Sequence, residues 1–511
     1  MPDHSPVTLQ GGSWKKNKSY FKFENWWLRT DGFTDRIRKW WDSFDYIGRP
    51  DYILASKLKA LKHKLKEWNR SEQGSLGQQR KNVLEKLAVV ENIATDRALT
   101  EDEATEKATL LLKLEGLIKN EEIYWRQRSR SVWLKEGDKN TKFFHKMANA
   151  HKRYNNIDQL LIQGNIVQDP ERIQGEIVEF YQKLYSENVQ WRPDNNFLNC
   201  PRLTGEEIED LERNFDEEEV LRSLKQCAVD KTPGPDGFTM GFYIKCWEVV
   251  KGDIMKTFQH FYDQGRFERS FNATFIALIP KKKGAKEPRD FRPISLIGSI
   301  YKILSKVLTE RLKRVMSKLV NSQQLAYVKG TQIMDAVLIA NEAIDSRSSL
   351  KKPGILCKLD IEKAYDHVNW DFLMGMLEKM GFGLKWRQWI KFCISSVSFS
   401  VLINGCPSGF FGSQRGLRQG DPLSPFLFLL VMEGLNNMIM NANLEGWLRG
   451  FEVARAGRES LKITHLQYAD DTLIFCDAEE DHLKILRLIL VLFEGMSGLH
   501  VNWRKSFLYP S

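Results

Sequence analysis

The alternation of apolar and polar positions divides the chain into a helical first part and a mixed second part. Between residues 52 and 130 apolar side chains recur at helical spacing, with lysines on the other faces. The two runs are Leu54, Leu58, Leu61 and Leu65, then Val83, Leu87 and Val90. Thr100 and Glu103 have the spacing of a capping box ahead of a further helix. The pattern predicts a solvated helical hairpin or coiled coil rather than a catalytic element.

Residues 124–153 combine cations with aromatic rings. Trp125, Trp133 and Phe143 alternate there with lysines and arginines. Cations neutralise phosphates and rings stack on bases, so this composition favours contact with nucleic acid. The alternative is an amphipathic helix whose rings are core and whose charges are solvated. The candidate nucleic-acid-binding residues are Arg126, Arg128, Arg130, Lys139 and Lys142.

After a looser connection near 170–203, short helical and strand-like runs alternate densely from residue 204 onward. Two strand-like runs, LKITHLQ and TLIFC, lie close on either side of Asp470 and Asp471, which places the two carboxylates at a hairpin turn. Asp is a favoured turn residue, which is the simpler explanation. However, two adjacent like charges need a compensating cation. Mg²⁺ fits, because it prefers hard oxygen ligands and keeps water and substrate phosphates in its shell.

A third carboxylate follows another strand-like run. Residues 355–359 are mostly apolar and Asp360 comes directly after them, a common ligand position in α/β architectures. Asn369 has the position of a helix N-cap. Tyr365 is close enough to wall a sugar pocket, where its ring would exclude a ribose 2′-hydroxyl. Taken singly, a strand-end cap and a core aromatic are the favoured explanations of Asp360 and Tyr365.

Two further segments carry candidate chemistry. The loop RGLRQGDPLSP contains Gly416 and Gly420, which permit a tight turn, and Gln419, which can face a base or sugar. Ser424 and Pro425 are expected to be the N-cap and first residue of an apolar helix. Earlier, a strand runs into a basic hairpin suited to a triphosphate. Its candidate residues are Lys281, Arg289 and Arg292. A loop that caps a helix and a solvated basic turn are the alternatives.

Composition narrows the class of protein. The length of 511 residues predicts two or three domains, and the formal net charge of +10 favours a polyanionic partner. The seven cysteines are scattered without a C-x-x-C pair, which fits a reducing compartment and argues against a zinc ribbon or disulfide framework. The longest apolar stretch, PFLFLLVM, is too short to span a bilayer. We therefore expect a soluble intracellular protein without membrane contact.

Together, and in this order, these segments resemble the reverse transcriptase of LINE-type (non-LTR) retrotransposons, most like those of plants. The matching stretches are KTPGPDGF, RDFRPISL, YKILSKVLTERL, LDIEKAYDHV, RGLRQGDPLSP, YADD and SGLHVNWRKS. The resemblance covers residues 204–511 and extends upstream through SVWLKEGDKNTKFFH. DHSP followed by FKFENWWL resembles the end of the endonuclease that precedes this polymerase.

The resemblance implies an α/β (α+β) right-hand polymerase fold, with fingers and an antiparallel palm sheet behind a mainly helical, basic region. Residues 1–50 would be the end of the endonuclease with a linker, and 51–203 a helical basic extension. Residues 204–511 would be fingers and palm, with a core at 275–511 and no thumb. The chain would be a truncated fragment of a second open reading frame. Thr331 stands where the family usually has Arg, which would weaken a template or backbone contact.

The resemblance also implies the roles of the site residues. Asp360, Asp470 and Asp471 would bind two Mg²⁺ ions, with Mn²⁺ as an alternative. Lys505 would lie near the pyrophosphate leaving group as a general acid. The implied nucleotide-binding residues are Tyr365 as steric gate, Gln419 and Gly420 toward nucleotide and template, and Lys281 with Arg289 or Arg292 on the triphosphate.

The implied activity is that of an RNA-directed DNA polymerase, a nucleotidyltransferase in which a primer 3′-hydroxyl attacks a dNTP. The expected partners are an RNA template, a DNA primer or target, and dNTPs. We expect a nuclear location, with the cytoplasm as the alternative, and leave the oligomeric state open. The alternative function is a catalytically inactive remnant or a domesticated nucleic-acid-binding protein.

Overall fold

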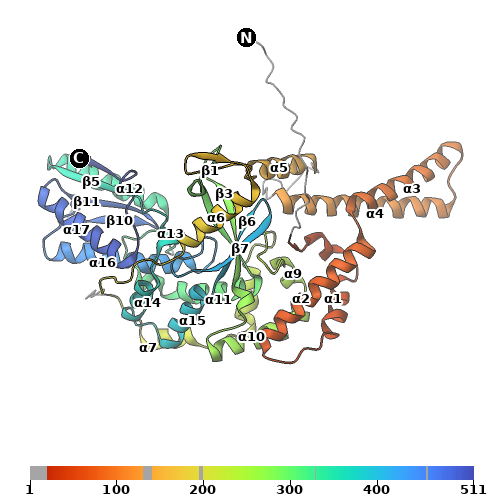
Figure 1. Ribbon diagram of the computed structural model, residues 1–511, viewed down its shortest axis with the longest axis horizontal. Coiled ribbons are helices and arrows are strands. Elements are labelled where there is room, and N and C mark those ends of the chain that lie inside the picture. The colour runs from red at the N-terminus through yellow and green to blue at the C-terminus, as the bar shows by residue number, and fades with distance from the viewer. Residues whose placement is uncertain (1–19, 130–140, 195–199, 329, 456–457, 511) are drawn as a thin grey trace, which may run out of the picture.

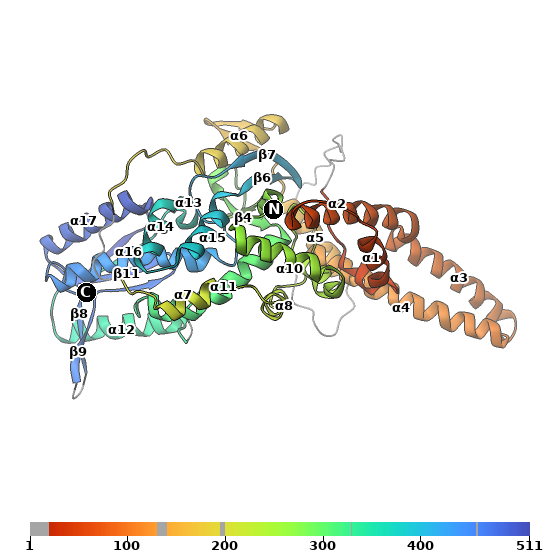
Figure 2. The ribbon, with the colours of Figure 1, turned by 90° about the horizontal axis from the view of Figure 1, so that it is seen from below.

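The computed structural model describes residues 20–129, 141–194, 200–328, 330–455 and 458–510. A helical N-terminal part and a mixed α/β part follow one another along the chain (Figure 1). Both views show a two-helix arm that projects away from a body containing two separate four-stranded sheets (Figures 1 and 2). Within the described ranges, no helix is both long enough and apolar enough to cross a membrane.

The N-terminal helices follow the predicted periodicity. The four leucines of the first run are buried on α2, and Val83, Leu87 and Val90 are buried on α3. Thr100 N–H donates to Glu103 Oε2 at 2.9 Å and Glu103 N–H donates to Thr100 Oγ1 at 3.4 Å, which confirms the capping box. The helical elements are η1 (Asn25–Arg29), α1 (Phe33–Asp42), α2 (Pro50–Trp68), η2 (Asn69–Gln73), α3 (Leu76–Asp96), α4 (Glu101–Ser129) and α5 (Thr141–Tyr154).

The projecting arm is the predicted helical hairpin. Helices α3 and α4 contact each other along its length and are joined by four residues. The side chain of Arg97 in this connection forms an ion pair with Glu103 at 2.6 Å, and its hydrogen bond lowers the pKa of Glu103 to about 2. This interaction anchors the connection between α3 and α4 to the first turn of α4.

Residues 20–41 pack onto the body rather than lying beside it. Phe23 N–H donates to Gly237 O at 2.8 Å, and the Trp41 indole donates to Asp253 Oδ2 at 2.8 Å. Gly237 has φ +81°, and a Cβ there would meet Phe21 O at 2.4 Å, so this contact requires glycine. The N-terminal aromatics thus share one hydrophobic core with the α/β part. The origin of residues 1–50 from an endonuclease stays a prediction.

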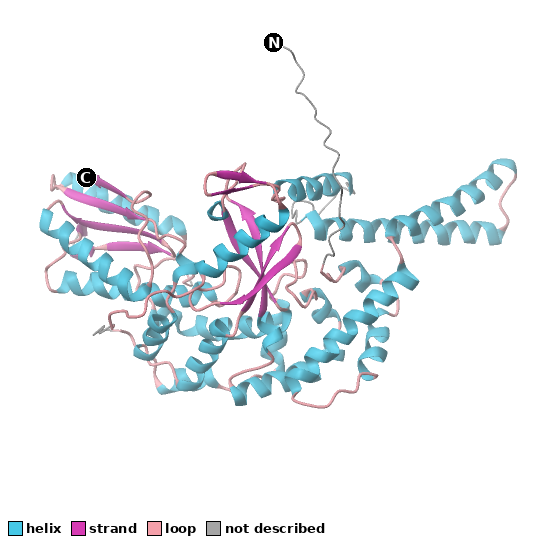
Figure 3. Ribbon diagram, viewed as in Figure 1, coloured by secondary structure: helices cyan, strands magenta, loops and turns pink. Residues whose placement is uncertain are grey.

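The first sheet, here called the mixed sheet, has the strand order β4-β3-β6-β7. Figure 3 shows it as the central group of strands, apart from the second sheet near the C-terminus. Strand β3 pairs antiparallel with β4 and parallel with β6, and β6 pairs antiparallel with β7. Helix α6 contacts β6 and β7. The elements are β1 (Leu160–Ile162), β2 (Asn165–Val167), α6 (Pro170–Leu184), β3 (Ala273–Pro280), β4 (Phe291–Ile297), β6 (Ser398–Ile403) and β7 (Cys406–Gly412).

The second sheet, here called the antiparallel sheet, has the order β10-β11-β5-β12. Alternate residues of β11 face opposite layers: Ile474 and Cys476 pack in the core with α16 and α17, and Phe475 packs in a second cluster with α12. The elements are α12 (Ile333–Ser349), β5 (Gly354–Leu359), α16 (Ser424–Leu444), β8 (Phe451–Arg455), β9 (Arg458–Ile463), β10 (His465–Tyr468), β11 (Asp471–Asp477), α17 (Glu480–Ser497) and β12 (Phe507–Pro510).

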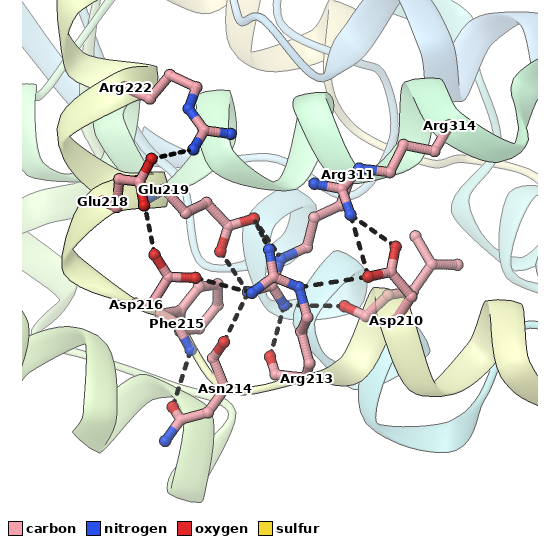
Figure 4. A network of polar contacts seen from close by, with 11 residues as sticks. Asp210, Arg213, Asn214, Phe215, Asp216, Glu218, Glu219, Arg222, Arg311 and Arg314 are labelled. Atoms are coloured by element: carbon pink, nitrogen blue, oxygen red, sulfur yellow. Dashed lines mark hydrogen bonds and ion pairs between the residues drawn. The ribbon is translucent and has the colours of Figure 1, made fainter.

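A buried arginine ties the connecting helices together. Arg311 on α11 is fully buried and forms a two-point ion pair with Glu219 on α8, with distances of 2.9 and 2.7 Å (Figure 4). Its remaining hydrogens reach backbone carbonyls at the end of α7. The connecting helices are α7 (Gly205–Glu212), α8 (Glu217–Lys225), α9 (Met240–Lys245), α10 (Trp247–Gln264), η3 (Arg269–Asn272), η4 (Pro288–Asp290), α11 (Ser299–Leu319), α13 (Ala364–His367), α14 (Trp370–Lys379) and α15 (Leu384–Ser395).

Candidate active site

The paired carboxylates lie at the tip of a tight hairpin, as predicted. Tyr468 of β10 pairs with Asp471 of β11, which leaves Ala469 and Asp470 as a two-residue turn. Ala469 has φ +57°, a left-handed conformation that is uncommon for alanine. The buried Gln324 holds this turn, because its Oε1 accepts from Ala469 N–H at 3.1 Å. Sequence reasoning missed Gln324, because its contact with Ala469 spans 145 residues and no local pattern indicates it.

Asp360 lies beside this turn. Leu359, the last residue of β5, pairs with Thr472 of β11, so Asp360 is next to the start of β11. Its Oδ2 accepts from Asn502 Nδ2 at 3.1 Å and lies 3.9 Å from Lys505 Nζ. The structure therefore brings together the three predicted carboxylates and the predicted lysine, although these positions are up to 145 residues apart in the sequence.

The electrostatics of the turn are unfavourable without a further cation. Partial desolvation by the surrounding chain raises the pKa of Asp470, although the residue remains exposed. The charges of Asp471 and Asp360 raise it further. Within the part of the chain that the structure describes, no three His, Cys, Asp or Glu side chains form a ready-made metal cage. The carboxylates nevertheless fit Mg²⁺, which takes hard oxygen donors and completes its shell with water and substrate phosphates.

Tyr365 borders the same carboxylates. It is half-buried, and its ring stacks on Phe428 of α16 with centroids 4.9 Å apart and an interplanar angle of 22°. Burial raises the pKa of Tyr365, and the nearby Tyr327 and the charge of Asp470 raise it further. The stack holds the ring of Tyr365 against α16, and its role as a steric gate stays a prediction.

The glycine-containing loop connects β7 of the mixed sheet to α16 and contacts α13. Gly416 has φ +89°, and a Cβ there would lie 2.6 Å from Asp366 O. Gly420 has φ +107°, and the neighbouring Gln419 O accepts from Ser295 N–H of β4 at 2.8 Å. The Gln419 amide donates through Nε2 to Asp366 Oδ2 at 3.3 Å. Gln419 is thus held at both its backbone and its side chain.

One local prediction about this loop is wrong. Helix α16 begins at Ser424, and the residue before it, Leu423, already has right-handed helical φ and ψ. Asp421 Oδ1 accepts from Leu423 N–H at 3.1 Å and supports this earlier start. Ser424 is therefore the first helical residue rather than the N-cap, and Pro425 is the second residue rather than the first.

The predicted basic hairpin contributes unequally to the site. Burial lowers the pKa of Lys281, and the nearby positive charges of Lys363, Arg292 and Lys505 add to this effect. Arg292 also acts on Asp470. Arg289 instead forms an ion pair with Glu287 and is mostly exposed. Lys363, which sequence reasoning missed, is held in a left-handed conformation with φ +46° at the start of α13.

The predicted nucleic-acid-binding residues on α4 have internal partners. Arg126 lies 3.4 Å from Asp230 Oδ2, and Arg128 lies 2.9 Å from Glu24 Oε1. Arg130 and Lys139 lie outside the described residues, and nothing is described of the Lys142 side chain. Contact of this region with nucleic acid stays a prediction.

A family model matches the part of the chain that contains this site. Residues 279–510, which contain all three carboxylates, match the family model described as reverse transcriptase (RNA-dependent DNA polymerase). The chain carries a reverse transcriptase domain. The matched residues begin at the end of β3 and end with β12, so they include the antiparallel sheet and all of the mixed sheet except most of β3.

The proteins similar to this chain include proteins of transposable elements and a mitochondrial protein. The transposon TX1 uncharacterized 149 kDa protein of Xenopus laevis is 26% identical over 96% of this chain and 37% of its own length. A Pol polyprotein from the retrotransposable element R2 of Popillia japonica is 26% identical over 56% of this chain and 39% of its own. The uncharacterized mitochondrial protein AtMg01250 of Arabidopsis thaliana is 48% identical over 14% of this chain and 56% of its own.

These relationships make the domain a LINE-type reverse transcriptase. The similarity to the TX1 protein includes the helical N-terminal part as well. The chain spans less than two fifths of the length of this relative and of the R2 relative. A special likeness to plant elements stays a prediction.

Proposed function

We propose that this chain is an RNA-directed DNA polymerase that extends a DNA primer along an RNA template with dNTPs. The observation that carries the proposal is the meeting of Asp360, Asp470 and Asp471 at the ends of β5, β10 and β11. Three carboxylates beside a basic cluster fit two-metal phosphoryl transfer, in which attacking and leaving oxygens are both stabilised. The mixed sheet would be the fingers and the antiparallel sheet the palm, within a core at 275–511.

The residues of the chain have separate tasks in this reaction. The three carboxylates would hold Mg²⁺, which supplies positive charge for activation of the primer 3′-hydroxyl and for the leaving pyrophosphate. Tyr365, stacked on Phe428, would exclude nucleotides that carry a 2′-hydroxyl. Lys505 would donate a proton to the leaving group, because it lies 3.9 Å from Asp360. Gln419 and Gly420 would position the nucleotide against the template.

The triphosphate would lie against Lys281 and Arg292. Arg292 is favoured over Arg289 because its charge acts on both Lys281 and Asp470, whereas Arg289 is committed to Glu287. A guanidinium group with free donors can bind phosphate oxygens at two points. Lys363 adds a further positive charge at the same place.

Primer extension tests the proposal. Purified residues 1–511 are supplied with a primed RNA template, dNTPs and Mg²⁺, beside the double variant Asp470→Asn, Asp471→Asn. We expect the wild type to extend the primer and the variant to lose more than about 1,000-fold, as when charge stabilisation is removed from phosphoryl transfer. If neither protein extends the primer while both bind the duplex, the chain is the catalytically inactive nucleic-acid-binding protein. A DNA target would place the protein in the nucleus, which fluorescence microscopy of a tagged chain tests.

A further inference from the structure

A buried carboxylate that the polymerase mechanism does not use lies directly behind Gln419. Asp366 on α13 is 2% exposed and accepts two side-chain hydrogen bonds. Its Oδ1 accepts from the Tyr185 hydroxyl at 3.0 Å, and its Oδ2 accepts from Gln419 Nε2 at 3.3 Å. Burial of a carboxylate costs free energy through desolvation, and its hydrogen bonds offset part of that cost. One of the two hydrogen bonds of Asp366 reaches Gln419, a residue of the candidate site.

The chemistry of a carboxylate fixes the orientation of the glutamine amide. An ionised Asp only accepts hydrogen bonds, so the amide nitrogen of Gln419 must face Asp366. The amide oxygen then points away from Asp366. The Gln419 backbone is held by Ser295 and its side chain by Asp366, so both ends of the residue are anchored. Asp366 therefore decides whether Gln419 offers an acceptor or a donor on its other side.

Tyr185 comes from a segment upstream of the residues that match the reverse transcriptase model. Its ring stacks on Phe399 of β6 at 5.1 Å with an interplanar angle of 17°. Its backbone oxygen accepts from Gln414 N–H at 2.8 Å, and the oxygen of Leu184 accepts from Arg415 Nε at 3.0 Å. The end of α6 thus holds the loop that carries Gln419 as well as the carboxylate behind it.

We propose that Asp366 is a positioning residue for nucleotide selection, backed by Tyr185, which sets the Gln419 amide so that its oxygen faces donor groups of the incoming dNTP. This inference rests on the proposed polymerase function. It makes the end of α6, outside the matched domain, part of the nucleotide site. The Asp366–Gln419 pair is separated by 53 residues and the Asp366–Tyr185 pair by 181.

The decisive experiment is a double-mutant cycle of Asp366→Asn and Gln419→Ala, measured as KM and kcat for dNTP in primer extension. Asparagine presents one acceptor atom where Asp366 presents two, so the Tyr185 hydroxyl must turn to accept, one contact is lost, or the Gln419 amide flips. We expect Asp366→Asn to raise KM about tenfold with little change in kcat, the effect of one misplaced hydrogen bond. In the Gln419→Ala background the same substitution should change KM less than about twofold. An equal effect in both backgrounds, or none in either, overturns the inference.

Two further variants guard against misfolding. Tyr185→Phe removes only the hydroxyl and should raise KM about threefold. Tyr181→Phe is the matched control, because the buried Tyr181 hydroxyl has no hydrogen-bond partner among the described residues, and KM should not change. If Asp366→Asn does not fold, as judged by its melting curve, equal KM values for Tyr185→Phe and Tyr181→Phe overturn the inference.

A binding measurement separates this inference from the proposed function. The Kd of a dNTP is measured for the complex with an RNA template and a dideoxy-terminated primer, where no chemistry follows. If the wild type neither extends a primer nor binds dNTP, both the proposed function and this inference are wrong. If the wild type does both and Asp366→Asn matches it in KM and Kd, only the inference is wrong.

Discussion

The buried Arg311 network and the carboxylate turn are both concentrations of charge, and the chain treats them in opposite ways. All five N–H groups of Arg311 have acceptors: two oxygens of Glu219 and the backbone carbonyls of Leu211, Arg213 and Asn214. The guanidinium also lies 4.5 Å from the centre of the Phe215 ring. Nothing remains on this group to bind a ligand (Figure 4).

The carboxylate turn is left unbalanced. The largest charges that act on Asp470 belong to two further carboxylates, Asp471 and Asp360, and Arg292 opposes them more weakly. Partial desolvation raises the pKa of Asp470, and the charges of these two carboxylates raise it further. A complete set of partners indicates a structural role, and an incomplete set indicates a place for substrate and cation.

Neutralising Asp470 and Asp471 should have the largest effect on activity and should not lower the stability of the protein. Because the folded-state pKa of Asp470 is raised, its contribution to stability is present below about pH 4 and is lost as pH rises through the folded pKa. At pH 7 the variant Asp470→Asn, Asp471→Asn should therefore lose more than about 1,000-fold in activity yet unfold at the same or higher urea concentration. A clear drop in the urea midpoint would contradict the unbalanced turn.

Arg311→Met should instead reduce stability. It should lower the free energy of unfolding by about 3 kcal/mol, because Glu219 loses its main buried partner. Urea denaturation at pH 7 measures this loss. The double variant Arg311→Met, Glu219→Leu is the control, and should be more stable than Arg311→Met alone. Equal stability of wild type and Arg311→Met would show that the network is dispensable.

Asp366 is an intermediate case, because burial raises its pKa to about 6 despite its hydrogen bonds. Its contribution to stability is present below pH 3.8 and is lost as pH rises through about 6. Between pH 4 and pH 7 the wild type should lose about 3 kcal/mol relative to Asp366→Asn. Urea denaturation of both proteins at several pH values measures the difference. A difference that does not change with pH would contradict the buried, ionisable state.

Tyr365→Ala should relax the choice of sugar. Loss of the ring would lower the preference for dNTP over rNTP by about 10- to 100-fold. Incorporation of matched ribo- and deoxynucleotides measures the ratio. Tyr365→Phe keeps the ring and its stack on Phe428 and should change the ratio only a few-fold. An unchanged ratio in Tyr365→Ala would remove Tyr365 from the gate.

The smallest contrast is between two arginines of the basic hairpin. Arg292→Ala should raise the KM for dNTP about tenfold, because a charge-assisted contact to phosphate is lost. Arg289→Ala should change KM less than twofold, because it removes only an exposed ion pair with Glu287, which contributes little free energy. Steady-state primer extension measures both. A larger effect of Arg289→Ala would reverse the assignment.

The sequence predicted what local pattern determines. The short strand-like runs near Asp470, the strand before Asp360 and the capping box at Thr100 all depend on neighbours within a few residues. The N-cap of α14 was predicted for the same reason, and Asn369 Oδ1 accepts from Phe372 N–H at 2.8 Å. The start of α16 was misplaced by one residue because Asp421 supports an additional helical residue.

Long-range partners were not predictable from the sequence. The Tyr185–Asp366 contact spans 181 residues and the Arg311–Glu219 pair spans 92. The helical spacing of Ile177, Tyr181 and Tyr185 indicates a buried face, but nothing in it indicates a contact with Asp366, and Gln324 belongs to no periodic pattern. The burial of Trp41 and its neighbours against α10 was likewise hidden, because aromatic pairs suit a linker and a core equally well.

The packing of the N-terminal aromatics on the body also bears on how the protein is made. Trp41 and its partner Asp253 are 212 residues apart. At about 5–20 residues per second, a ribosome needs roughly 10–40 s to deliver that partner. Throughout this interval Phe23, Trp26, Trp27 and Trp41 have emerged without the surface that buries them in the finished protein. We therefore expect the nascent chain to depend on chaperones during synthesis, and polypeptides that end before α10 to aggregate.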